Sequence, residues 1–94
     1  MDADIRAIYE HLHSRYPIIL SSSLCRGFKS KIDFPVLHGR STLGEFELFY
    51  DDVSFAFYAM HDHGEVFAHW HMQTPIEAEN AVADFMQGKL WITK

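Results

Sequence analysis

The sequence predicts an α+β fold, a two-layer sandwich with element order α-β-β-β-β-α. Apolar residues recur at helical spacing near both ends of the chain, and they alternate with polar residues over most of the segments between. Short turns join the alternating segments, which favours a four-stranded antiparallel meander. Both helices are expected to cover one sheet face, which leaves a second, open face.

Composition limits the class of protein. The chain has 94 residues, 48% of them hydrophobic, and we expect a single α+β domain over residues 1–94. The net charge is −5, and residues 41–94 hold nine acidic and two basic side chains. This acidic half argues against nucleic acid as a partner and suits a basic protein or a cation. An acidic N-terminus, the single Cys25 and the lack of a long apolar run predict a cytoplasmic protein without a membrane anchor.

The first element is predicted as a helix from about Asp4 to Tyr16. Ile5, Ile8 and Leu12 fall on one stripe, and Pro17 stops the helix. The apolar run 18–20 is expected to enter the core, and residues 21–30 form the longest irregular stretch.

Four strands are expected next, over residues 32–38, 45–50, 53–61 and 66–73. Pro35 cannot donate to a ladder, so the first of them is predicted as an edge strand. Two-residue turns at 51–52 and 63–64 join the last three strands.

The last helix begins with a capping box. Thr74 is the N-cap, Pro75 takes the first helical position and Glu77 follows three residues after the cap. Gly88 ends the helix, and residues 90–93 are a candidate fifth strand.

The open face carries the candidate site. On the fourth strand His69 and His71 point to one side, because residues two apart share a face. The assumed turns predict two rows across three strands, Glu47–Ala56–His71 and Glu45–Tyr58–His69, with carboxylate and imidazole about 10 Å apart. Phe67 lies on the same side, whereas His61 is expected on the core side and His63 in solvent.

Two functions are compatible with this face. The favoured one is an acidic binding domain that engages a protein, or a second copy of itself as a homodimer, through the open face and the edge of the fourth strand. Its binding residues are predicted to be Glu45, Glu47, Tyr58, Phe67, His69 and His71. No catalytic residue is assigned and no cofactor is expected, since no nucleophile with a partner base is evident, and the sequence favours a binding protein over an enzyme.

The alternative is a metal-dependent or histidine-assisted small-molecule site. His69 and His71 would supply two ligands to zinc or another divalent ion, and Glu47 or Glu45 a third. Two histidines on one strand are a weak signal, because a catalytic zinc site needs three protein ligands.

Overall fold

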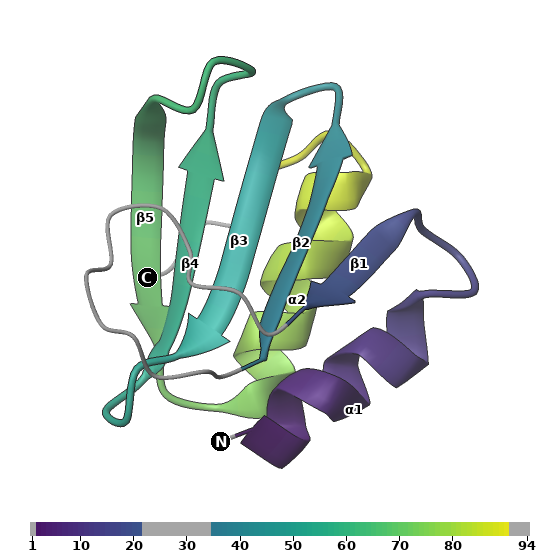
Figure 1. The fold of residues 1–94 in the computed structure, drawn as a ribbon, viewed down its shortest axis with the longest axis vertical. Coiled ribbons are helices and arrows are strands. Elements are labelled where there is room, and N and C mark those ends of the chain that lie inside the picture. Colours follow the sequence, from purple (N-terminus) through teal and green to yellow (C-terminus); the bar gives the residue numbers. More distant parts are fainter. Residues whose placement is uncertain (1, 22–34, 91–94) are drawn as a thin grey trace.

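The chain folds as one five-stranded antiparallel sheet with a helix at each end (Figure 1). The computed structural model describes residues 2–21 and 35–90. The predicted α+β class is confirmed, with the order α-β-β-β-β-β-α. The elements are α1 (Asp2–Leu12), β1 (Ile18–Ser21), β2 (Val36–Ser41), β3 (Gly44–Tyr50), β4 (Phe55–Met60), β5 (Val66–Met72) and α2 (Pro75–Met86).

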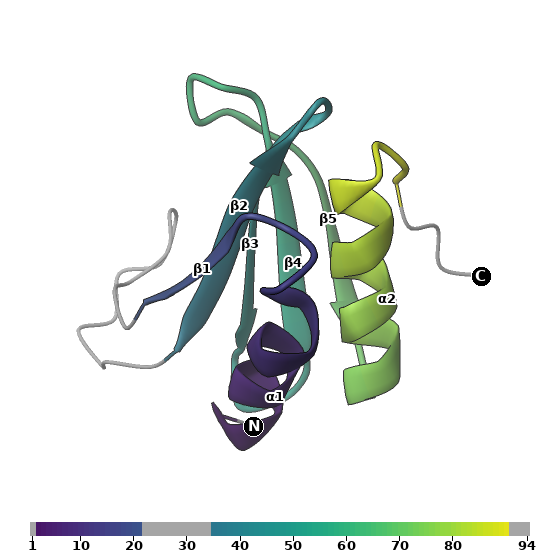
Figure 2. The same cartoon turned by 90° about the vertical axis from the view of Figure 1, so that its right-hand side faces the viewer.

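The sheet is a plain meander in which each strand pairs with the next along the chain. Figure 2 shows both helices on the same side of the sheet, as expected for a two-layer sandwich. Neither described helix is long and apolar enough to cross a membrane.

The position of the fifth strand corrects the prediction. The added strand is β1, at the edge of the sheet beside β2, and Leu90 lies outside any strand. Residues 91–93, the rest of the predicted fifth strand, lie outside the described residues. The run 18–20 was expected only to enter the core, but its burial alternates, with Ile18 buried and Ile19 exposed. A run this short resembles a core segment as much as a strand, because periodicity over three residues is weak.

The predicted edge strand is likewise internal. β2 pairs with β1 on one side and β3 on the other. Pro35 directly precedes the first residue of β2, so its missing N–H removes no ladder bond. The strand predicted over 32–38 runs from Val36 to Ser41 instead, and residues 32–34 lie outside the described residues.

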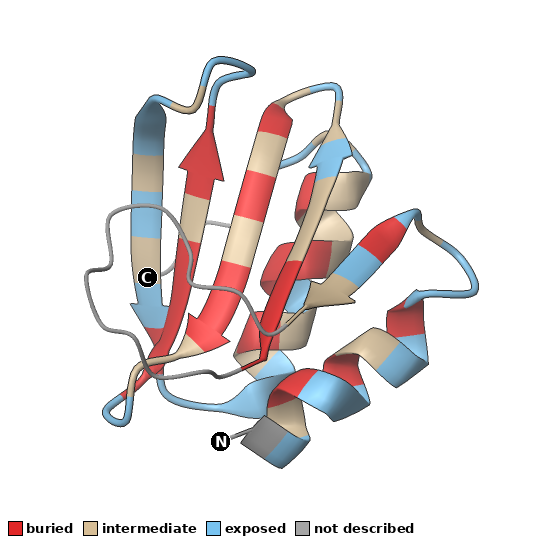
Figure 3. Ribbon diagram, viewed as in Figure 1, coloured by how far each residue is buried: buried red, intermediate tan, exposed pale blue. Residues whose placement is uncertain are grey.

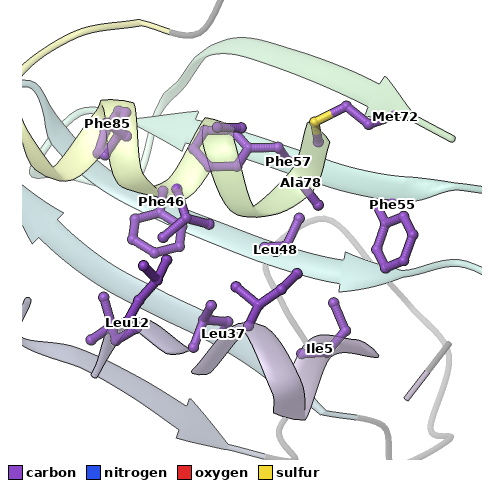
Figure 4. Close-up of a cluster of buried hydrophobic side chains, with 14 of the residues drawn as sticks. Ile5, Leu12, Leu37, Phe46, Leu48, Phe55, Phe57, Met72, Ala78 and Phe85 are labelled. Carbon is purple, nitrogen blue, oxygen red and sulfur yellow. The ribbon is translucent and has the colours of Figure 1, made fainter. Parts of the chain in front are cut away.

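The core lies between the sheet and the two helices. Phe57 stacks on Phe46 at 5.4 Å between ring centroids, and Phe85 of α2 meets both rings edge-on. Ile5 and Leu12 of α1 extend the same buried cluster (Figure 4). Ile8 of the same helix belongs to it as well. These residues are the apolar stripes of the predicted helices and the inward positions of the strands.

The end of β5 leads into α2 through the predicted cap. The Thr74 hydroxyl accepts a hydrogen bond of 3.2 Å from the backbone N–H of Glu77 and donates one of 3.1 Å to the Glu77 carboxylate. Pro75 occupies the first turn, and Gly88 follows the helix with a φ of 85°. Two residues therefore separate β5 from α2, and the helix turns back over the sheet.

The open face is divided into a buried part and an exposed part (Figure 3). Val36, Phe49 and Ala56 form a second buried cluster on this side, and Met60 is buried as well. Along β5 the same face is exposed. The prediction of an open face is therefore wrong over the middle strands, because alternation shows which side a residue takes and not what covers that side.

Candidate functional site

The exposed part of the open face is centred on β5. Phe67, His69 and His71 point to this side, whereas Ala68 and Trp70 are half-buried toward the helices and Met72 is fully buried. Phe67 retains 36% of its surface in water. Each inward residue of β5 pairs with an apolar residue of β4. The inward positions of β5 were therefore predicted correctly.

Tyr58 joins β5 to its neighbour. The pairings Tyr58 with His69 and Ala56 with His71 are confirmed. The Tyr58 and His69 rings stack at 5.4 Å with an interplanar angle of 16°. On its other side Tyr58 stacks on the buried Phe49 at 5.8 Å. Tyr58 thus connects the buried cluster of this face to the exposed strand.

His61 adds an aromatic contact that corrects the sequence prediction. It was placed on the core side, but it is exposed and stacks on Phe67 at 4.6 Å. The register between β4 and β5 shifts at Ala59/Met60, and such a bulge changes the direction of the residues that follow it. His63 is exposed as predicted and lies 5.7 Å from His61 between ring centroids. We call Tyr58, His61, Phe67, His69 and His71 the β5 surface.

His71 has a fixed orientation. Its Nδ1 shares a hydrogen bond of 3.0 Å with the hydroxyl of Ser54, a buried residue just before β4. The Asp51 carboxylate lies 3.7 Å from the same nitrogen. The His69 ring meets the His71 ring edge-on at 5.6 Å. Ordered rings of this kind make contacts at a low cost in side-chain entropy.

The two predicted carboxylates occupy other positions than expected. Glu47 pairs with Tyr58 and Glu45 with Met60, so the predicted register between these strands is wrong by two residues. The turn spans Asp51–Ser54 instead of two residues, and the Asp51 carboxylate accepts hydrogen bonds from the N–H groups of Val53 and Ser54. A register shift of two residues keeps each side chain on the same face of the sheet, so both carboxylates remain on the open side.

A charged network absent from the prediction lies beyond Glu45. The Arg40 guanidinium donates to the carboxylates of Glu45 and Asp62, which links β2, β3 and the turn before β5. Nearby is a cleft of about 440 Å³ on the open face. Its described lining is Pro17, Ile19, His38, Gly39, Arg40, Glu45, Phe46, Glu47 and Met60. Arg40 opposite Glu45 would have been found had the strand been extended past His38 to Ser41.

The proposed metal ligands do not converge within the described part of the chain. His69 and His71 are neighbours, but Tyr58 stands between His69 and Glu47 in the same row, and Glu45 is bonded to Arg40. Across residues 2–21 and 35–90 no group of three or more His, Cys, Asp or Glu side chains is placed to hold a metal ion. Cys25 and its basic loop lie outside these residues.

Chemically, the β5 surface offers aromatic faces and imidazole nitrogens but no charge at neutral histidine. No Asp, Glu, Lys or Arg occurs between Glu65 and Glu77. Such a surface contacts aromatic, apolar and hydrogen-bonding groups, while the Glu45 and Glu47 side supplies negative charge. No family model, curated protein or solved structure matches this chain.

Proposed function

We propose that this chain is a binding domain that engages a protein partner through the open face, with the β5 surface at the centre of the contact. The observation that carries the proposal is a row of ring contacts along β5, in which His61 stacks on Phe67 and Tyr58, His69 and His71 contact one another in series. Four of these rings are exposed, and Tyr58 is half-buried. Aromatic residues are enriched at the centres of protein interfaces, where they bury a large area with few rotatable bonds.

Charge supports a division of roles across the face. The β5 surface is uncharged at neutral histidine, whereas Glu45, Glu47 and Asp62 lie on the side of β3 and the turn. Arg40 bonds to Glu45 and Asp62 and offsets part of this charge, so the side of β3 and the turn stays negative overall. In an interface of the usual kind the uncharged rings would be desolvated, and the acidic side would lie toward the rim and steer a basic partner. Such a partner would place an apolar or aromatic group on Phe67 and His69 and its positive charge toward the acidic side of the face.

The test is capture of partners from an extract of the source cells with immobilised protein. The Phe67→Ala/His69→Ala double variant removes two exposed rings, and Ile76→Ala removes an exposed apolar side chain from α2 as a matched control. We expect the double variant to lose at least about tenfold in recovered partner, a loss of about 1.4 kcal/mol. Ile76→Ala should recover as much as the wild type. Equal recovery by all three proteins would contradict the proposal.

The metal hypothesis has a separate test. Elemental analysis of untagged protein, purified without chelator, should give no stoichiometric zinc, iron or nickel, because two neighbouring histidines without a third ligand bind these ions weakly. About one metal ion per chain, lost in the His69→Ala/His71→Ala variant, would favour the alternative function instead.

A further inference from the structure

We propose that the outer edge of β5 pairs with β5 of a second copy of this chain, in antiparallel orientation about a twofold axis at His69. The inference extends the proposed function to the edge of the same strand, and it leaves the side chains of the β5 surface free to contact another protein. Two five-stranded sheets would join into one continuous sheet.

The edge of β5 presents hydrogen-bonding groups. Among the described residues β5 pairs with β4 alone (Figure 1). The backbone N–H of Asp51 donates to the Ser54 carbonyl at 3.0 Å, which makes these two residues a hydrogen-bonded pair at the start of the β3–β4 ladder. Bonded and non-bonded pairs alternate in an antiparallel ladder, so Ala56 and Tyr58 bond to β3 and Phe57 bonds to β5.

The same alternation continues into β5. Phe57 pairs with Trp70 and Ala59 with Ala68, so the backbone groups of these β5 residues bond to β4. The N–H and C=O groups of His69 and His71 therefore point away from the sheet. Phe67 lies at the register shift between Ala59 and Met60 and has no partner on β4, so the alternation does not extend to it.

A twofold axis at His69 uses both outward residues. His69 of each copy would pair with its own counterpart, so its outward N–H and C=O groups gain partners, and His71 would lie opposite Phe67 of the other copy. This register also matches side chains on the helix side, where the half-buried Trp70 would lie opposite the small Ala68 in both directions. On the open side Phe67 would meet an imidazole, a contact that it already makes with His61.

Charge favours a second copy as the occupant. The chain carries −5, yet no Asp, Glu, Lys or Arg occurs from Val66 to Ile76. Two acidic copies can approach along this uncharged strand, whereas a basic partner would gain nothing from charge there. The strand also lacks the lysine, proline or inward charge that protects natural sheet edges, and its one register shift lies at Phe67, outside the segment from Ala68 to Met72. The opposite edge, β1, is only four residues long.

The test begins with sedimentation velocity of the purified, full-length protein between about 1 µM and about 1 mM. One strand pair buries an area at the low end of specific interfaces, so we expect a monomer–dimer equilibrium within this range. A monomer at every concentration would overturn the inference. If the protein is monomeric but the Phe67→Ala/His69→Ala variant captures less partner than the wild type, the proposed function is still supported.

Two variants locate the axis. His69→Glu places two carboxylates opposite each other at the axis and should raise the dissociation constant at least about tenfold, whereas His69→Gln should change it by less than about twofold. Far-ultraviolet circular dichroism checks that both variants are folded. Equal dissociation constants for both variants and the wild type would contradict pairing at this register.

Hydrogen exchange gives a readout that needs no variant. Between dilute and concentrated protein, exchange should slow at the amides of His69 and His71 and stay unchanged at Ala68 and Trp70, which already bond to β4. A dimer that protects neither the His69 nor the His71 amide would place the interface elsewhere and overturn the inference.

Discussion

The strands β4 and β5 are neighbours of similar hydrophobic character, and the chain buries one and exposes the other. In β4 every residue but Tyr58 is buried, and in β5 only Met72 is. Both alternate between the same two faces. The difference arises from position, because β4 lies between two strands and has buried neighbours on both of its faces. β5 is rich in apolar and aromatic residues like β4, although it lies at the edge of the sheet. This composition indicates that its exposed side contacts another molecule.

Truncation of a β4 core ring should have the largest effect. Phe57 is fully buried and contacts Phe46, Trp70 and Phe85. Phe57→Ala should lower the free energy of unfolding by about 3–5 kcal/mol, since it removes buried surface and leaves a cavity. Urea denaturation measures this loss. A change below about 1 kcal/mol would contradict the burial of β4.

The inward side of β5 should give an intermediate effect. Trp70 is half-buried and lies 5.5 Å from the Phe57 ring between centroids. We expect Trp70→Ala to cost about 1.5–2.5 kcal/mol, roughly half the cost of a fully buried aromatic ring. If this variant were as damaging as Phe57→Ala in the same urea titration, β5 would belong to the core as fully as β4.

The hydrogen bond between Ser54 and His71 should contribute less. Ser54→Ala leaves the His71 Nδ1 without its 3.0 Å partner, and the imidazole remains accessible to water. The expected loss in stability is about 1 kcal/mol, together with a changed His71 side-chain signal in NMR spectra. An unchanged signal would show that this hydrogen bond does not orient the ring in solution.

The outward side of β5 should contribute least to stability. Phe67 retains 36% of its surface in water and contacts His61 alone among the ring pairs of the described residues. Phe67→Ala should lower the free energy of unfolding by about 0.5–1 kcal/mol, because part of the ring is covered, while it weakens partner capture. A loss near that of Trp70→Ala would mean that this ring supports the fold instead.

The pairings of Tyr58 and Ala56 with the two histidines were predicted correctly, although the assumed turn was not. His61 bonds to Glu65, so the turn holds three residues instead of two, and the register shift between Ala59 and Met60 restores the predicted register further along the strands. The β3–β4 register failed because Asp51 organises a longer turn through its carboxylate, and a left-handed φ of 74° at Asp52 completes it. No alternation pattern carries that information.

Other parts of the site depend on contacts between distant segments. To predict the contact of Arg40 with Glu45, one must know that β2 continues to Ser41. To predict that Phe49 is buried, one must know how the open face is covered. The edge strand β1 was missed because three apolar residues show no clear period. Sequence patterns therefore placed the rings of β5 on one face but did not separate the exposed rings from the buried ones.

The most direct test of the binding function is an NMR spectrum of isotope-labelled protein in an unlabelled extract of the source cells. Contact with a large partner broadens the signals at the interface. The account predicts broadening at Tyr58, Phe67, His69 and His71, with the α2 signals of Ile76 and Asn80, both exposed, much less affected. Broadening confined to α1 and α2, or none at any residue of the β5 surface, would contradict it.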